Sequence, residues 1–315
     1  MKKILLLVLV AGSLFASTER VKSLGGNAGF WGDDYSSMSV YPANVNNHNV
    51  AWFDNVTSTT GDEDTKVTTS ANAFTAVWGD GMKFGFGASS EENEVLNMWW
   101  GTGNMGANFG VNWSDDFAFN TSFGYNMSGV GNIGVHFDYG TMMNFGLNFG
   151  RAQNIWIWDN MSVAFHMNDI GGDDDHMMAD LNFWKVNNWG STKGLFGATF
   201  SFDNMAQMDD AGVAMMKDDG SAFNDTSLWL KWTFGAETML NDWATFRVGY
   251  DQAYDFMNQY GGPANASMGL GFNYGGFMLD MTLLSYNDMM TNPVQYITGF
   301  NEKALGSGFS ISYMW

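Results

Sequence analysis

The sequence predicts an all-β fold, a transmembrane antiparallel up-and-down β-barrel of about 14 strands (14–16). Three observations predict it: runs of alternating apolar and polar residues, a polar face built from Asn and Gly, and few charged residues. In the clearest run, residues 131–150, Ile133, Val135 and Phe137 alternate with small or polar residues. Side chains of a strand alternate between its faces, so each run has one apolar and one polar face. A tilted strand of roughly 9–11 residues crosses a bilayer, and these runs approach that length.

Composition supports this fold class. The chain is 45% hydrophobic and 16% aromatic but only 15% charged, whereas about 25% is typical of a soluble domain. After residue 16 no stretch approaches the roughly 18 apolar residues that a spanning helix needs. Few charges and many aromatic residues are typical of a barrel whose strands keep one polar face. A secreted soluble β-protein, with its apolar face turned inward, is an alternative that would purify without detergent.

The chain is acidic and has no cysteine. Its formal net charge is −20, which argues against a nucleic-acid partner because the phosphate backbone requires a basic surface. The acidic excess suits a cation-preferring lumen, or external loops bridged by divalent ions. The absence of cysteine excludes disulfides and thiolate metal sites.

Residues 1–16 have the pattern of a signal peptide. Lys2 and Lys3 precede an apolar stretch at residues 4–10, and residues 11–16 form a cleavage region. We therefore expect export and removal of this segment. The alternative is a membrane anchor that stays attached.

Residues 17–64 do not alternate cleanly but contain three ordered features. Gly-Gly at residues 25–26 is followed by an acidic pair at 33–34 and by Pro-Ala at 42–43. This order resembles the N-terminal region of the FadL-like superfamily, which includes long-chain fatty-acid and aromatic-hydrocarbon transporters and the PorV-type barrels of type IX secretion. The chain departs from that pattern at Asn27 and Tyr41.

The resemblance implies that residues 17–64 form a hatch inside the barrel and that the cargo is hydrophobic. A first strand plus a surface loop is the alternative for this segment. The barrel itself is assigned to residues 65–315.

Strand candidates follow regularly along the rest of the chain. They lie at residues 72–78, 82–87, 95–101, 105–113, 117–126, 131–139, 143–150, 161–167, 177–185, 194–202, 227–237, 243–250, 267–274, 277–285 and 306–315. Short links at 79–81, 114–116 and 275–276 predict periplasmic turns. Longer polar links predict external loops at 89–94, 170–176, 203–225, 251–265 and 287–303.

The last strand resembles the signal by which outer-membrane barrels are recognised for assembly. Phe309, Ile311, Tyr313 and Trp315 alternate with small or sulfur-containing residues. The resemblance implies contact with the outer-membrane assembly machinery. Trp and Tyr residues near strand ends predict interfacial contacts with outer-membrane lipid and lipopolysaccharide.

Five charged or titratable residues are candidates for the lumen or pore. His136 and Asp138 lie two residues apart on one polar face, which suits a polar lumen pair better than an acid–base pair because no catalytic motif accompanies them. Lys231, Glu237 and Arg247 fall on predicted polar faces. They are expected either to set a transverse field in a pore or to form structural ion pairs.

Metal, cofactor and catalytic motifs are weak or missing. Asp173, Asp174 and Asp175 are candidate Ca²⁺ ligands, but their spacing does not match a calcium-loop template, so an acidic surface loop is favoured. A Gly-rich stretch at 101–106 opens a strand rather than a helix, so it does not predict nucleotide binding. We expect no cofactor and no enzymatic activity.

The predicted function is therefore passive passage of small solutes through an outer-membrane channel or transporter, with hydrophobic cargo implied by the FadL-like resemblance. The alternative is a non-conducting structural or secretion-accessory barrel of the PorV type, which would have the same sequence features and a plugged lumen.

Overall fold

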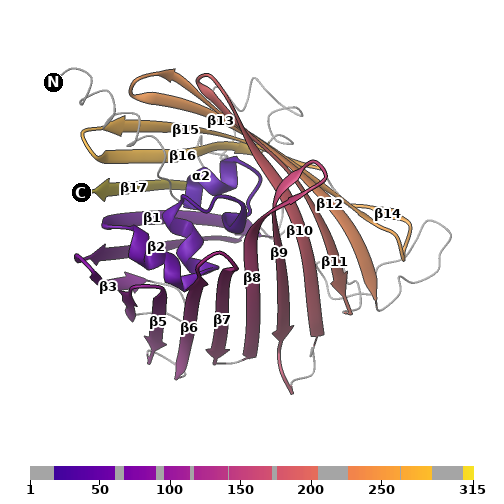
Figure 1. Cartoon of the computed structure of the whole chain (residues 1–315), viewed down its shortest axis with the longest axis horizontal. Coiled ribbons are helices and arrows are strands. Elements are labelled where there is room, and N and C mark those ends of the chain that lie inside the picture. The colour runs from indigo at the N-terminus through magenta and orange to yellow at the C-terminus, as the bar shows by residue number, and fades with distance from the viewer. Residues whose placement is uncertain are drawn as a thin grey trace.

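The chain forms a closed antiparallel β-barrel (Figure 1). The computed structural model describes residues 18–60, 67–89, 96–113, 117–140, 142–171, 176–204, 226–262, 264–285 and 308–315. Long strands pair with their neighbours along the chain, and β1 (Val50–Thr60) also pairs with β17 (Gly308–Met314), which closes the barrel. The predicted all-β up-and-down architecture is confirmed. The barrel has 16 long strands, so the prediction of about 14 was too low.

The remaining strands are β2 (Val67–Trp78), β3 (Met82–Ser89), β4 (Leu96–Thr102), β5 (Met105–Asn112), β6 (Ala118–Met127), β7 (Gly131–Tyr139), β8 (Met143–Ile155), β9 (Trp158–Asn168), β10 (His176–Trp189), β11 (Thr192–Asp203), β12 (Ser227–Asn241), β13 (Ala244–Asp255), β15 (Asn265–Tyr274) and β16 (Phe277–Ser285). A two-residue strand, β14 (Tyr260–Gly261), extends the edge of β13.

The strand that the sequence pattern missed is β1. It lies inside the segment 17–64, and its polarity is mixed. Trp52 and the buried Asp54 face the lumen, while Phe53 and Asn55 face outward. An indole on the inner face and an amide on the outer face hide the alternation by which a strand is recognised.

The two faces of the wall differ in chemistry. Large apolar side chains such as Phe84, Phe123 and Phe234 are exposed on the outside. Aromatic rings also pair there across neighbouring strands, with Trp158 and Phe234 stacked on either side of Phe196 at 4.8 and 4.9 Å between ring centroids. The inner face carries Gly, Asn, Ser and Thr. This is the pattern of a barrel surrounded by lipid.

The connections divide the barrel into a turn end and a loop end. Tight turns at 79–81, 103–104 and 275–276 lie at the turn end, where Gly79 and Gly275 adopt positive φ. The longer connections lie at the loop end. Residues 114–116 are outside the described residues, but the strands that flank them, β5 and β6, meet at the loop end. The prediction that this link lies at the same end of the barrel as those at 79–81 and 275–276 was therefore wrong.

Residues 18–49, here called the inserted segment, lie inside the barrel against its concave face (Figure 1). They form α2 (Thr18–Ser23) and three short 3₁₀ helices, η1 (Ala28–Phe30), η2 (Tyr35–Ser39) and η3 (Pro42–Asn47). Asn27 and Asp34 cap η1 and η2 by accepting backbone N–H groups at 3.0 and 2.8 Å. None of the described helices is long and apolar enough to span a membrane.

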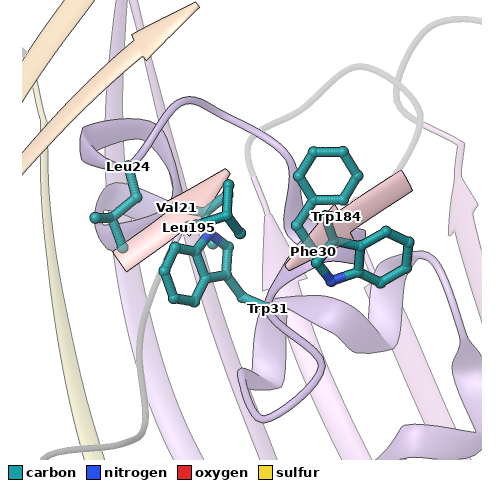
Figure 2. Close-up of a cluster of buried hydrophobic side chains, with 6 residues drawn as sticks. All are labelled: Val21, Leu24, Phe30, Trp31, Trp184 and Leu195. Atoms are coloured by element: carbon teal, nitrogen blue, oxygen red, sulfur yellow. The ribbon is translucent and has the colours of Figure 1, made fainter. Parts of the chain in front are cut away.

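Two buried apolar clusters lie between the inserted segment and the wall. Figure 2 shows the first, in which Phe30 stacks on Trp184 of β10 at 4.9 Å and Trp31 lies near Val21 and Leu195. The second cluster is Tyr35, Met38, Val45, Val50 and Val77. The hydrophobic core of this barrel is therefore the contact between the inserted segment and the wall.

Candidate functional site

The wall beneath the inserted segment is made largely of glycine. A Cβ added to Gly106 would lie closer than 3.0 Å to Pro42, and one added to Gly134 equally close to Val40. Both contacts would be with backbone atoms, which cannot rotate away. The wall accepts the segment at these points because it has no side chain there.

This glycine track follows the inserted segment across much of the barrel. Lumen-facing glycines whose added Cβ would come closer than 3.0 Å to the segment lie on β4, β5, β6, β7, β8, β11, β12, β13, β15 and β17; they are Gly101, Gly106, Gly124, Gly134, Gly150, Gly197, Gly235, Gly249, Gly269 and Gly308. Glycine in a strand weakens it unless another backbone approaches closely. Here the close approach is made by the inserted segment.

A network of buried charges fixes the start of the segment. Arg20 Nε and Nη2 donate to Glu237 at 2.7 and 2.9 Å, and its Nη1 donates to Asp34 at 3.0 Å. Arg247 then joins Glu237 to Asp280, with both distances 2.6 Å. All five side chains are buried. Two guanidinium groups thus serve three carboxylates, and bidentate contacts of this type are the stronger kind of ion pair.

Burial makes the network interdependent. Desolvation alone would lower the pKa of Arg20, but the carboxylates of Glu237 and Asp34 hold it above its ordinary value, so the guanidinium stays charged. Removing one partner of such a network leaves the others as buried, uncompensated charges. The inserted segment and the wall are therefore linked electrostatically.

The five predicted lumen residues fall into two groups. The structure places Glu237 and Arg247 opposite each other on β12 and β13, as members of the buried network. Lys231 lies further along β12 on the lumen face and is 3.8 Å from Asp251, with about half of its side chain exposed. Glu237 joins the segment to the wall, Arg247 pairs with Glu237 and Asp280 within the wall, and Lys231 faces the lumen.

The histidine pair contacts the inserted segment. His136 Nε2 is 3.0 Å from the carbonyl oxygen of Val40, to which it donates in the matching tautomer. Asp138 follows on the same face of β7, and both residues line one cavity. In the described part of the chain, no Ser or Cys side chain is hydrogen-bonded to His136.

The inserted segment lies between two cavities. The loop-end cavity, of about 330 Å³, is lined by residues of β1–β7 with Thr18 and Ser39 of the segment. The turn-end cavity, of about 400 Å³, is lined by the opposite side of the segment and by residues of β6–β11, including Trp184 and Lys193. The two cavities have no lining residue in common.

The two remaining predicted sites are the candidate Ca²⁺ cluster and the last strand. Asp173, Asp174 and Asp175 lie outside the described residues, and no group of three potential metal ligands occurs within the described ones. On β17, Phe309, Ile311 and Tyr313 share the outer face, and Trp315 stacks on Tyr313 at 5.8 Å. Their role in assembly stays a prediction.

Sequence reasoning missed Arg20, Asp34 and Asp280, which complete the buried network. Arginine and lysine together number only 13 in the chain. The position of one of them, Arg20, near the acidic pair at 33–34 was the one signal that could have indicated an ion pair. The partner strands are more than 200 residues away, and no local pattern connects them.

Comparison with known proteins identifies the fold. No model of a known protein family matches the chain, and no curated protein matches it in sequence. A solved structure described as a bacterial polysaccharide outer-membrane secretin matches with a TM-score of 0.50 and 12% identity, over 85% of this chain and 99% of that one. At this identity the likeness shows the fold alone. The chain has the fold of outer-membrane β-barrels.

Two further structures resemble the chain less closely. The Ralstonia pickettii toluene transporter TbuX matches with a TM-score of 0.46 and 11% identity, over 95% of this chain and 98% of that one. A porin matches with a TM-score of 0.45 and 7% identity, over 84% and 99%.

Proposed function

We propose that this protein is an outer-membrane channel or transporter through which small solutes pass passively, and that the inserted segment is a hatch in its lumen. The observation that carries the proposal is the position of residues 18–49 between two separate lumen cavities. A solute that crosses the barrel from one cavity to the other has to pass this segment.

A movable hatch would have to exchange the polar contacts that α2 makes with the wall. Arg20 pairs with Glu237 of the wall, and Thr282 donates to the Glu19 carbonyl oxygen at 3.1 Å. When a lumen hydrates, water offers replacement hydrogen bonds to groups of this kind. A wall attachment made only of interlocked apolar side chains would have no such exchange.

The FadL-like resemblance supports a hatch, but it implies a different cargo from the one that the cavity favours. It implied hydrophobic solutes, whereas the loop-end cavity is lined mainly by amide and hydroxyl groups. Burying these groups against a hydrocarbon would leave them without partners, which is costly. We therefore favour a FadL-like arrangement with polar cargo. The formal net charge of −20 favours cations over anions.

A disulfide can lock the hatch, because the native chain has no cysteine. A Cβ on Gly101 would lie 2.5 Å from Val45 Cγ1, which places the two Cβ atoms near the roughly 3.5–4.5 Å that a disulfide spans. In liposomes, we expect the Val45→Cys/Gly101→Cys variant to pass small polar solutes when reduced and to lose most of this flux when oxidised.

The single variant Val45→Cys under the same oxidant is the matched control. Flux that is equal in the oxidised and reduced double variant would show that the segment is not the hatch. The non-conducting alternative predicts no flux in either state, nor after the segment is displaced by a bulky residue at Gly106. That result would move a structural or secretion-accessory role ahead.

Localisation and assembly complete the proposal. The fold, the exposed aromatic side chains of the outer face and the alternating last strand support insertion in an outer membrane, with lipid and lipopolysaccharide as surroundings and the assembly machinery as a transient partner. No enzymatic step is proposed.

A further inference from the structure

The loop-end cavity combines amide groups with indole rings. Asn97, Asn108 and Asn120 project into the lumen from β4, β5 and β6, and the indoles of Trp52 and Trp99 line the same space. Hydroxyl groups of the wall and of the segment complete the lining. An amide side chain offers both donors and acceptors, and an indole offers a flat apolar face beside one N–H donor.

The amides of the cavity are held in place by protein partners. The Asn108 amide nitrogen donates to Asn97 Oδ1 and, at 3.2 Å, to the Met98 carbonyl oxygen. These contacts fix the planes of two amides before any ligand enters, and such preorganisation lowers the entropic cost of binding.

The charge of the lining is nearly neutral. Asp138 and His136 are the only titratable residues among those that line the cavity, and neither lysine nor arginine is present. An anion would find no cation to pair with there. A hydrocarbon chain would desolvate the amides without replacing their hydrogen bonds.

One polar atom of the cavity lacks a partner. The indole Nε1 of Trp99 is buried, and none of the described residues accepts a hydrogen bond from it. Buried polar groups almost always have a partner. The atom is not accessible in this structure, so a ligand that accepts from it has to turn the indole towards the cavity. A hydroxyl or ether oxygen would serve.

From these observations we propose that the loop-end cavity is a binding site for a neutral polyhydroxylated solute of the mono- or disaccharide class, and that this is the cargo class of the proposed channel. A sugar ring has an apolar C–H face that fits against an indole, and a rim of hydroxyls that both donate and accept, as amides do. The volume of about 330 Å³ lies within the usual range of small-molecule sites. The role of the sugar as cargo rests on the proposed function, whereas the binding site is proposed independently of transport.

Binding can be tested without transport. The full-length protein in detergent micelles would be titrated with maltose and sucrose, and contact would be followed by saturation-transfer NMR of the sugar protons. Octanoate, gluconate and choline serve as the apolar, anionic and cationic comparison probes. We expect both sugars to bind, and octanoate and gluconate to give no saturable signal.

Conservative variants locate the site. Trp99→Phe keeps an aromatic face but removes the N–H donor, so we expect sugar binding to weaken about fivefold, in line with the loss of one hydrogen bond. Asn108→Leu should weaken it similarly. Trp184→Phe is the matched control, because Trp184 lines the turn-end cavity, and it should change binding less than twofold.

Two outcomes would overturn the proposal. One is the absence of saturable sugar binding to the folded wild-type barrel; the other is sugar binding that Trp99→Phe and Asn108→Leu leave unchanged. Choline binding that disappears in Asp138→Asn would assign the cavity to cations instead. Sugar binding by a barrel that shows no flux would refute the channel but keep the site, whereas flux without sugar binding would refute only the site.

Discussion

The two halves of the inserted segment are attached to the barrel in different ways. In the first half, residues 18–34, Arg20 is paired with Glu237 of the wall at 2.7 Å and both side chains are buried. In the second half, residues 35–49, the backbone around Pro42 rests directly on lumen-facing glycines such as Gly106. The first attachment depends on charge, because it is made by paired ionised groups. The second depends on shape, which only a change of sequence can alter.

The largest effect is expected from removing the central charge of the first half. Arg20→Met leaves the buried carboxylates of Glu237 and Asp34 without their common partner. The free energy of unfolding should fall by about 3–5 kcal/mol, the usual cost of breaking a buried ion pair. Urea unfolding in detergent micelles measures it.

A triple variant separates charge from packing. In Arg20→Met/Asp34→Asn/Glu237→Gln, only Arg247 and Asp280 stay charged, and they already pair at 2.6 Å. Most of the lost stability should return, because a neutral replacement of a whole buried network is often tolerated. A triple variant no more stable than Arg20→Met would show that the arginine acts by its shape.

The next effect concerns the junction between the second half and β1, where His48 is buried. Burial, helped by the charge of Lys83, lowers the pKa of His48 to about 4 from its ordinary 6.5. The unfolded chain takes up a proton below pH 6.5 while the folded protein does not. Stability is therefore complete above pH 6.5 and is lost as the pH falls towards 4, by at most about 3 kcal/mol.

The matched variant is His48→Gln, which has no titrating group at this position. Its free energy of unfolding should depend less on pH than that of the wild type between pH 6.5 and 4, and the two curves should run parallel above pH 7. Parallel curves over the whole range would contradict a neutral buried histidine. The difference between the two proteins isolates His48 from the other titrating groups.

The sequence could predict the barrel because a strand is a local pattern. Fifteen strands alternate visibly, since one face of each meets lipid and the other meets the lumen. The missing strand, β1, carries Trp52 inside because the second half of the segment covers it there, where Trp52 packs against Tyr35 at 4.8 Å. The pattern failed at β1 because an indole meets the segment there, whereas glycines meet it on the other strands.

The candidate site was predictable only in part. Glu237 and Arg247 lie on two neighbouring strands, and the alternation of each strand shows which of its faces is polar. Their place in the lumen therefore followed from the sequence. Their partner Arg20 is separated from Glu237 by 217 residues, and no spacing rule joins an N-terminal helix to a strand that far along the chain. In the sequence, the glycine track was visible only as small residues of the polar face. Its role becomes apparent only from its contact with the inserted segment.

Adding a single methyl group to the wall tests the second half of the segment, whose attachment depends on shape. Gly106→Ala places a Cβ against the backbone of Pro42, so the second half has to shift. We expect a loss of about 2 kcal/mol, as for overpacking in a core. Gly261→Ala is the control, because no atom lies within 4 Å of its added Cβ. Equal urea midpoints for the two variants would contradict a seated segment.

The smallest effect is expected from a partly exposed ion pair of the first half. Lys193 pairs with Asp33 at 2.7 Å and lies over the Trp31 ring at 5.3 Å, but both charged side chains are partly exposed. Lys193→Met should cost less than about 1 kcal/mol. Salt screens exposed pairs far more than buried ones, so this difference should vanish in about 0.5 M NaCl. The loss of unfolding free energy caused by Arg20→Met should persist at this salt concentration, because the partners of Arg20 lie out of reach of the ions. A salt-sensitive Arg20 effect would mean that the network is hydrated in the resting barrel.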